Sequence, residues 1–351
     1  MLSSIGVRGP VAPLAHTMEN PIMFRSTVFF CLCLGALPAL AQPFGAPGRM
    51  TPVRLDSNSS GFGYYEYIPK DYSTDKKWPL VLYFHGTGEK GDGTTGLNVL
   101  LKTGVPALFR NDTDRITTND HHRPFLMLAP QDTAGWPSAD RIWKMVEFAK
   151  TRYAVDTNRI YATGVSAGGG TTWGFVNKYG NRIAAAAPIC GAGNVSNDAR
   201  ALRKLPVWAF HAFNDGTVPL TQTLQNVDRI AKGTDSCIRA YPSGSSKTVS
   251  KGTHTLRFDT TTLAWSHDSG FVVPRQNLAL TIYESGGHDS WTRTYANETF
   301  WTWLLAQSRP QSGVSRRSNH PVESSMSRPH FPGTRWVVPA GTFDAQGRAR
   351  P

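Results

Sequence analysis

The chain has 351 residues, of which 40% are hydrophobic and only 18% are charged, and its formal net charge is +12. This length and composition suit one large globular α/β domain or two smaller ones, and the lack of internal repeats excludes a repeat array. The basic residues form no basic helix and do not alternate with aromatic residues, so we expect no nucleic-acid partner.

The N-terminal segment has the pattern of a secretion signal. Arg25 precedes an apolar run over residues 28–40, which is too short to span a bilayer. The run ends in small residues that fit a cleavage rule, with Gln42 as the first mature residue. We therefore expect residues 1–41 to be a signal peptide with an N-terminal extension, and the protein to be secreted or periplasmic. No other segment is long and apolar enough to predict stable membrane insertion.

Strand-like and helix-like segments alternate between residues 42 and 309. β-Branched and aromatic runs bounded by Gly and Pro predict strands at 61–69, 79–86, 124–131, 159–164, 182–191, 205–213 and 278–285. Apolar residues at helical spacing predict helices at 139–153, 167–180, 220–233 and 291–307. This alternation predicts an α/β fold, a mostly parallel sheet with helices on both faces, whose ligands bind beyond the carboxyl ends of the strands.

The stretch GVSAGGG, which begins at Gly164, places Ser166 between a predicted strand and a predicted helix. Glycine at 164 and at 168 lets the strand and the helix approach more closely than a Cβ would allow. A nucleophile elbow needs this context, because its sharp turn lifts the serine hydroxyl above the sheet. A Gly-rich turn without chemistry is the alternative interpretation.

A serine nucleophile needs a base, and the base needs a carboxylate that orients it. His288 lies just beyond the last predicted strand, at the end of the sheet where Ser166 lies. Asp215 also follows a strand, and the chain order Ser, Asp, His is that of α/β-hydrolases. We predict these three as the catalytic residues; a surface histidine and a plain turn aspartate are the alternatives. Asp289 is the rival carboxylate, although adjacent residues rarely face each other.

Two backbone amides would have to stabilise the oxyanion of the transition state. We predict Ala167, which follows the nucleophile, as one donor. The other is predicted in the stretch FHGTGEKG, from Thr87 or Gly88. His85 is expected to hold this loop rather than to act as a second base.

The cysteines and histidines show no metal-binding spacing, so we expect neither a metal nor a cofactor. Cys190 ends a predicted strand at the end of the sheet where Ser166 lies, whereas Cys237 follows a helix that returns to the opposite end. A strand length of about 17–20 Å would separate them, which is too far for a disulfide. We predict two unbonded thiols.

Residues 233–276 form a predicted insertion, which should emerge away from the active site and not form a lid. Within it, HTLRFDT and GFVVP are expected to form a small hairpin or an added edge of the sheet. Residues 310–351 are rich in Ser, Pro and Arg without any period, which predicts a disordered tail. Residues 42–309 remain as the catalytic domain.

Several stretches together resemble a known family: PLVLYFHGTGEKGD, NRIYATGVSAGGGTTWG, AAAAPICGAG, PVWAFHAFND and GGHDSW. The chain resembles α/β-hydrolases of the "predicted peptidase" and secreted-esterase group, near feruloyl esterases, polyhydroxybutyrate depolymerases and dienelactone hydrolases. The resemblance covers about residues 60–232 and 278–309. Ala212 stands where the family usually has Gly, and the predicted insertion is longer than usual.

Position by position, the resemblance implies the α/β-hydrolase fold, Ser166 as nucleophile, Asp215 as acid, His288 as base, and Thr87 and Ala167 as oxyanion donors. We expect a secreted serine hydrolase that cleaves carboxylic esters, small or polymer-linked, through an acyl-enzyme. A serine peptidase related to prolyl oligopeptidases, or a non-catalytic binding module, is the alternative.

Three tryptophans have two possible roles in this interpretation. Trp136, Trp173 and Trp291 would line an acyl pocket if they reach the active site, or pack in the core if they do not.

Overall fold

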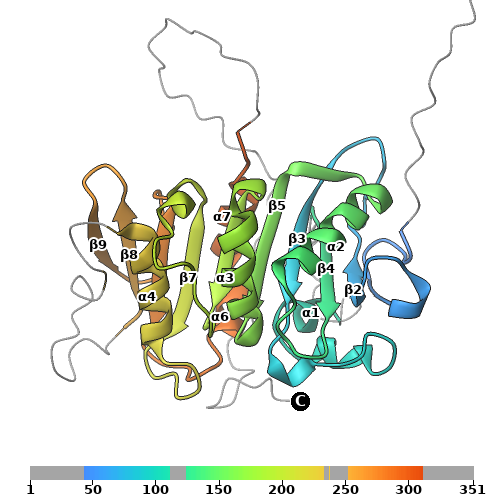
Figure 1. Ribbon diagram of the computed structural model, residues 1–351, viewed down its shortest axis with the longest axis horizontal. Helices are drawn as coiled ribbons and strands as arrows, with labels where there is room; N and C mark the ends of the chain where they lie inside the picture. Colours follow the sequence, from blue (N-terminus) through green and yellow to red (C-terminus); the bar gives the residue numbers. More distant parts are fainter. Residues whose placement is uncertain (1–42, 111–123, 233–236, 238–251, 311–351) are drawn as a thin grey trace, which may run out of the picture. The chain divides into compact units, whose positions relative to one another are not determined.

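Ten strands form one sheet in the computed structural model, which describes residues 43–110, 124–232, 237 and 252–310 (Figure 1). The strands are β1 (Met50–Val53), β2 (Gly63–Tyr67), β3 (Trp78–Phe84), β4 (Leu126–Gln131), β5 (Val155–Val165), β6 (Ala185–Ile189), β7 (Val207–Ala212), β8 (His254–Asp259), β9 (Ala264–Ser269) and β10 (Leu278–Tyr283). The helices are α1 (Gly104–Phe109), α2 (Ala139–Arg152), α3 (Ala167–Tyr179), α4 (Leu220–Ala231), α6 (Trp291–Tyr295) and α7 (Glu298–Ala306).

The centre of the sheet is parallel and its two edges are antiparallel. The order is β1-β2-β4-β3-β5-β6-β7-β10-β8-β9. Strands β4, β3, β5, β6, β7 and β10 run parallel to one another. The pairs β1–β2 and β8–β9 are added to the two edges in antiparallel fashion. The predicted α/β fold with a mostly parallel sheet is therefore confirmed.

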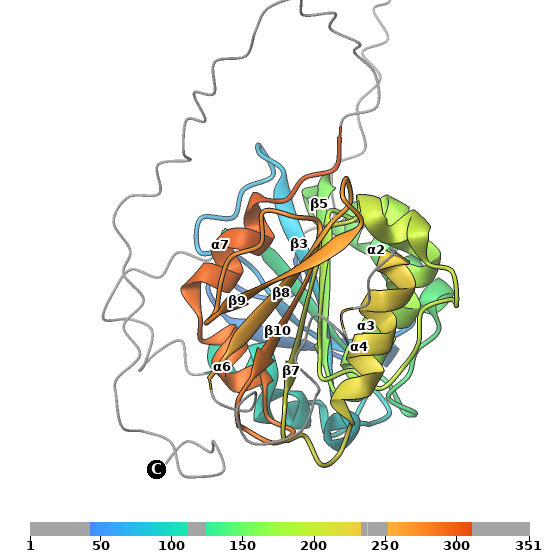
Figure 2. The ribbon, with the colours of Figure 1, turned by 90° about the vertical axis from the view of Figure 1, so that its left-hand side faces the viewer.

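Helices cover both faces of the sheet, as the sequence pattern predicts. Helices α2, α3 and α4 lie on one face, and α6 and α7 lie on the other (Figure 2); α1 packs on that second face as well. Along β3 the side chains alternate, so that Leu80 and Leu82 face the first layer while Val81 and Tyr83 face the second. One apolar core therefore packs on each face of the sheet. This packing fixes the positions of the loops at the carboxyl edge of the sheet.

The predicted final helix over 291–307 is wrong as a single element. The chain instead forms α6 and α7, which are separated at Ala296 and Asn297. The side chain of Asn297 accepts a hydrogen bond from the backbone N–H of Thr299 at 3.0 Å. An N-cap of this kind satisfies an amide that has no partner within the helix, so Asn297 starts a new helix.

The predicted insertion contributes an edge hairpin. Strand β8 pairs antiparallel with β10, and β9 pairs with β8, which confirms an added edge. The second strand of the hairpin is β9, and not GFVVP as expected. The expected location is also wrong in part, because His254 lies opposite Ile282 near the carboxyl end of β10. Strands that pair along β10 necessarily extend from one end of the sheet towards the other.

Several predictions lie wholly or partly outside the described residues. They concern the signal segment at 1–41, the insertion at 233–236 and 238–251 and, apart from Pro310, the C-terminal tail. All described residues belong to one compact unit, and the proposed boundaries at 41 and 309 stay predictions. Within the described ranges, no helix combines the length and the apolar character that a bilayer span requires. Strand β1, with only four residues, is an element that the sequence pattern did not predict.

Candidate active site

Ser166 occupies a strained turn between β5 and α3. Its backbone has φ 56° and ψ −119°, a conformation that non-glycine residues rarely adopt. A Cβ at Gly168 would come within 2.0 Å of the carbonyl oxygen of Phe84, and one at Gly164 within 2.5 Å of the carbonyl oxygen of Gly168. The two glycines are therefore required by close packing of the turn against β3. The turn has the strand, serine and helix arrangement of a nucleophile elbow.

A chain of hydrogen bonds connects Ser166 to His288 and Asp215. The distance from Ser166 Oγ to His288 Nε2 is 2.8 Å, and the distance from His288 Nδ1 to Asp215 Oδ2 is also 2.8 Å. Because the carboxylate can only accept, His288 Nδ1 donates to it, and Nε2 is left to accept the serine hydroxyl proton. The three residues follow β5, β7 and β10, whose carboxyl ends lie at the same edge of the parallel sheet. Their catalytic roles stay predictions.

The carboxylate of Asp215 is buried and surrounded by donors. Its Oδ1 accepts hydrogen bonds from the amides of Thr217 and Val218 at 2.8 and 2.9 Å. Burial raises the pKa of Asp215, but hydrogen bonds from His211, His288 and the two amides outweigh burial and hold this pKa below its ordinary value. Asp215 therefore stays ionised at neutral pH, as a residue that orients an imidazole must.

Asp289, the rival carboxylate, faces its own helix. Its two oxygens accept hydrogen bonds from the backbone amide and from the hydroxyl of Thr292, at 2.9 and 2.7 Å. These contacts place Asp289 at the start of α6, where a carboxylate satisfies free helix amides. The geometry therefore favours Asp215 as the partner of His288.

The two predicted oxyanion donors border Ser166. Thr87 begins a short 3-10 turn, Thr87–Glu89, directly after Gly86. A Cβ added to Gly86 would lie 3.7 Å from the Cβ of Ser166, so this loop passes beside the serine. Ala167 begins α3, and amides in the first turn of a helix have no partner within the helix. Both amides are thus placed near Ser166, and their role as an oxyanion hole stays a prediction.

His85 braces the loop that carries Thr87. The amide of Asp132 donates to His85 Nε2 at 3.1 Å, so the ring hydrogen resides on Nδ1, which donates to the Gly86 carbonyl at 2.6 Å. Since a peptide unit is planar and trans, a fixed Gly86 carbonyl makes the Thr87 N–H point away from His85. Burial lowers the pKa of His85, which keeps this ring neutral. The structure therefore agrees with the predicted loop-holding role.

Cys190 contacts the backbone of His288, and this contact was not predicted. Its Sγ donates to the backbone carbonyl of His288 at 3.4 Å. Burial raises the pKa of Cys190 to about 12, so the sulfur is a thiol. Neither Cys190 nor Cys237 is in a disulfide, which agrees with the prediction.

Three potential metal ligands, Cys190, Asp215 and His288, lie together in the described part of the chain, with ligand atoms within 4.8 Å of one another. A metal would need the thiolate, and the three groups already bond to one another or to nearby backbone. Their chemistry suits proton transfer better than metal binding.

Glu89 is a second residue that sequence reasoning did not single out. Its side chain is buried, and Oε2 would lie 3.1 Å from a Cβ at Gly86, so the carboxyl group packs against the Gly86 loop. Burial raises the pKa of Glu89. The glycines on both sides of it in GTGEKG suggest an exposed turn, so the sequence held no signal of this burial.

The three tryptophans have different environments. Trp173 is fully buried in the core, which is the second of its two possible roles. Trp136 is 46% exposed on the loop after β4, and a Cβ at Gly170 would meet its ring at 2.2 Å, which places it against the first turns of α3. The ring of Trp291 stands at 90° to that of His288, with 5.4 Å between the centroids. Two of the three thus border the site.

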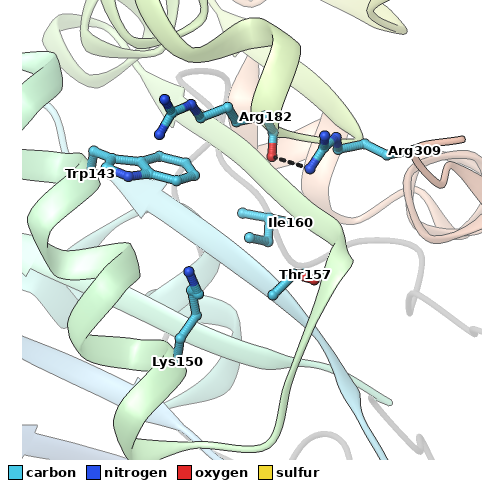
Figure 3. Close-up of a pocket in the computed structure, with 6 residues that line it drawn as sticks. All are labelled: Trp143, Lys150, Thr157, Ile160, Arg182 and Arg309. Atoms are coloured by element: carbon cyan, nitrogen blue, oxygen red, sulfur yellow. Dashed lines mark hydrogen bonds between the residues drawn. The ribbon is translucent and has the colours of Figure 1, made fainter. Parts of the chain in front are cut away.

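A separate cavity of about 240 Å³ lies near the opposite end of the sheet. Lys150, Arg182 and Arg309 surround it, with Trp143 and Ile160 as its apolar wall (Figure 3). Ile160 precedes Ser166 by six residues on β5, which corresponds to roughly 20 Å of extended chain. This cavity is therefore not part of the candidate active site.

Comparisons with known proteins point to esterases. Feruloyl esterase D from Neurospora crassa is 24% identical over 228 residues, which cover 59% of this chain and 74% of that protein. The bifunctional acetylxylan esterase/xylanase XynS20E from Neocallimastix patriciarum is 32% identical over 91 residues, which are 26% of this chain and 13% of that protein. A solved thermostable esterase is 24% identical with a TM-score of 0.48, covering 74% of this chain and 63% of that chain.

No family model matches the chain. The mostly parallel sheet and the elbow turn at Ser166 agree with the sequence likeness to the Neurospora crassa and Neocallimastix patriciarum proteins. The chain has the α/β-hydrolase fold, and its sequence is similar to that of esterases.

Proposed function

We propose that the protein is a secreted serine carboxylesterase. The observation that carries this proposal is the unbroken hydrogen-bond chain from Ser166 through His288 to Asp215, with both heavy-atom distances at 2.8 Å. Such a chain lets an imidazole take the serine proton while the carboxylate stabilises the imidazolium that forms. Secretion is proposed from the signal-like residues 1–41.

The proposed reaction has two halves. Ser166 Oγ attacks the ester carbonyl carbon while His288 Nε2 takes the hydroxyl proton, and the amides of Thr87 and Ala167 stabilise the oxyanion. The tetrahedral intermediate then expels the alcohol, which receives that proton from His288. In the second half, His288 deprotonates a water molecule that attacks the acyl-enzyme. The acid is released and Ser166 regains its proton.

The surroundings of the site favour an aromatic acyl group over acetyl. Trp291 lies edge-on to His288, Trp136 is 46% exposed, and Phe213, on the loop before Asp215, is 43% exposed. Exposed aromatic rings at a site give planar groups a surface on which to stack. We therefore propose feruloyl-type esters, the class named for the Neurospora crassa relative, as the preferred substrates. Acetylated xylan is the second candidate, because it is named for the other relative.

A substrate panel tests the proposal. The chain starting at Gln42 would be assayed with methyl ferulate, 4-nitrophenyl acetate, acetylated xylan and an alanine 4-nitroanilide. We expect the highest kcat/KM for the ferulate, lower values for the acetyl esters and no anilide cleavage. Anilide cleavage at the rate of the esters would favour the peptidase alternative. No turnover of any substrate would favour a binding module.

A matched pair of variants tests the aromatic contacts. Trp136→Ala should lower kcat/KM for methyl ferulate more than for 4-nitrophenyl acetate. Phe44→Ala is the control, since Phe44 is also exposed, at 39%, but packs on Arg152 in α2. Equal losses for both esters in Trp136→Ala would contradict the aromatic preference.

A further inference from the structure

His211 is a buried polar residue in an otherwise apolar strand. It lies on β7, where its neighbours in sequence are Phe210 and Ala212, and its side chain has no exposed surface. A polar side chain at such a position costs free energy unless hydrogen bonds compensate its burial. Its partners therefore indicate why an imidazole is present.

Both ring nitrogens of His211 have partners. Nδ1 lies 2.9 Å from Thr223 Oγ1 on α4. Nε2 lies 2.9 Å from the carbonyl oxygen of Val218 and 3.2 Å from Asp215 Oδ2. Both of these oxygens can only accept, so Nε2 carries a hydrogen that is shared between them.

These contacts form a closed set of hydrogen bonds among His211, Val218 and Asp215. Val218 donates its amide to Asp215 Oδ1 at 2.9 Å, and the carbonyl of the same residue accepts from His211. Asp215 Oδ2 lies between His211 Nε2 and His288 Nδ1. Because the Asp215 side chain is fully buried, no solvent replaces a lost donor. The imidazole thus ties the loop that carries Asp215 to helix α4.

We propose that His211 is a positioning residue, which holds the Asp215 carboxylate in the orientation that faces His288. This inference rests on the proposed function, because it acts through Asp215. Thr223 on α4 holds the His211 ring at Nδ1, and the carbonyl of Val218 holds it at Nε2. His211 itself does not touch Ser166 or the reacting atoms.

Three variants test the role through kcat and KM for the preferred ester. His211→Leu removes the donor and should lower kcat about 10- to 100-fold with little change in KM, the range known for loss of a hydrogen-bond partner of a metal-binding side chain. His211→Gln, whose amide nitrogen can donate in place of Nε2, should recover part of kcat. Thr223→Val keeps the shape but removes the hydroxyl, and should give a smaller loss in the same direction.

A double-mutant cycle with Asp215→Asn separates positioning from mere packing. If His211 acts through Asp215, then adding His211→Leu to Asp215→Asn should lower kcat less than twofold further. An equal 10- to 100-fold loss in both backgrounds would overturn the inference. So would an unchanged kcat in either His211→Leu or Thr223→Val, with thermal unfolding used to verify that each variant is folded.

The same cycle separates the failure of this inference from that of the proposed function. If Asp215→Asn keeps the activity of the unaltered protein, the proposed catalytic chain fails, and the positioning role fails with it. If Asp215→Asn loses activity while the folded His211→Leu does not, only the positioning role is overturned.

Discussion

The two ends of the parallel sheet differ in how their polar groups are arranged. At the carboxyl ends, Asp215 is fully buried and bonded to His288, and the backbone is strained at Ser166 and Cys190, both with positive φ. At the opposite end, cationic side chains surround a cavity of about 240 Å³, and Arg182 on its rim is exposed.

This difference shows that a measurable cavity does not by itself mark a reactive site. The candidate catalytic residues are distinguished by matched donors and acceptors and by a strained nucleophile turn, which fix reacting groups before a substrate arrives. The cavity at the other end has charge and volume but no such arrangement. Substitutions at the two ends should therefore have very different consequences.

The largest effect is expected at Ser166. Ser166→Ala removes the attacking oxygen and should lower turnover by about 10⁴- to 10⁶-fold, because the residues of such a chain act as a unit. Steady-state kinetics with a ferulate or acetyl ester measures it. Ser266→Ala, an exposed serine on β9, is the control and should keep full activity. Near-normal turnover in Ser166→Ala, or loss of activity with a chelator, would contradict a metal-free serine mechanism.

A smaller effect is expected at His85. His85→Asn can still donate to the Gly86 carbonyl, whereas His85→Leu cannot and should misplace the Thr87 amide. Loss of one oxyanion donor typically costs about 10²- to 10³-fold in kcat, so the Leu variant should fall towards this range and the Asn variant well short of it. Equal kcat values for the two variants would show that the hydrogen bond to Gly86 is not what places the loop.

His85 also predicts a dependence of stability on pH. Burial lowers the pKa of His85, while an imidazole in the unfolded chain titrates near 6.5. As the pH falls through that value, the unfolded chain binds a proton that the folded chain does not, so the folded state loses stability. The decrease in Tm between pH 7 and pH 5 should therefore be smaller in His85→Asn than in the unaltered protein. An equal decrease in both would refute this assignment.

The cysteines should distinguish the folded from the unfolded protein. Cys190 and Cys237 are both buried and not bridged, and burial keeps Cys190 as a thiol. A thiol reagent should react slowly with the folded chain that starts at Gln42, and should count two groups after denaturation without reductant. A count of zero in a monomeric protein would mean that a disulfide forms and that the two sulfurs come together.

The smallest effects are expected away from the carboxyl ends. Arg182→Ala at the basic cavity should leave kcat/KM unchanged and shift Tm by less than about 2 °C, as exposed substitutions usually do. Removal of residues 311–351 should likewise change neither activity nor Tm, because that segment has no periodic apolar face. A large change in kcat/KM in either protein would show that the two ends of the sheet are coupled.

The sequence pattern predicts the fold and the three candidate catalytic positions because each depends on local signals. Ser166 has glycines around it, and Asp215 and His288 each follow an apolar run. Long-range pairing is different, since nothing local shows that β9 rather than GFVVP pairs with β8.

The support of His211 by Thr223 was also beyond prediction, because it depends on how α4 packs against β7. The sequence nevertheless indicates that His211 has buried partners. His211 is the one polar side chain within VWAFHAF, and such a residue in a buried strand requires partners.

The hairpin at one edge of the sheet has a consequence for how copies of the protein behave in concentrated solution. Without it, β10, which is buried at every position, would present open backbone donors and acceptors to another chain. The outermost strand is instead β9, which carries mostly exposed or half-buried side chains, among them His267 and Asp268. The other edge ends in the short β1, which contains Pro52 and so lacks one backbone donor. Both edges are therefore poor templates for aggregation through added strands.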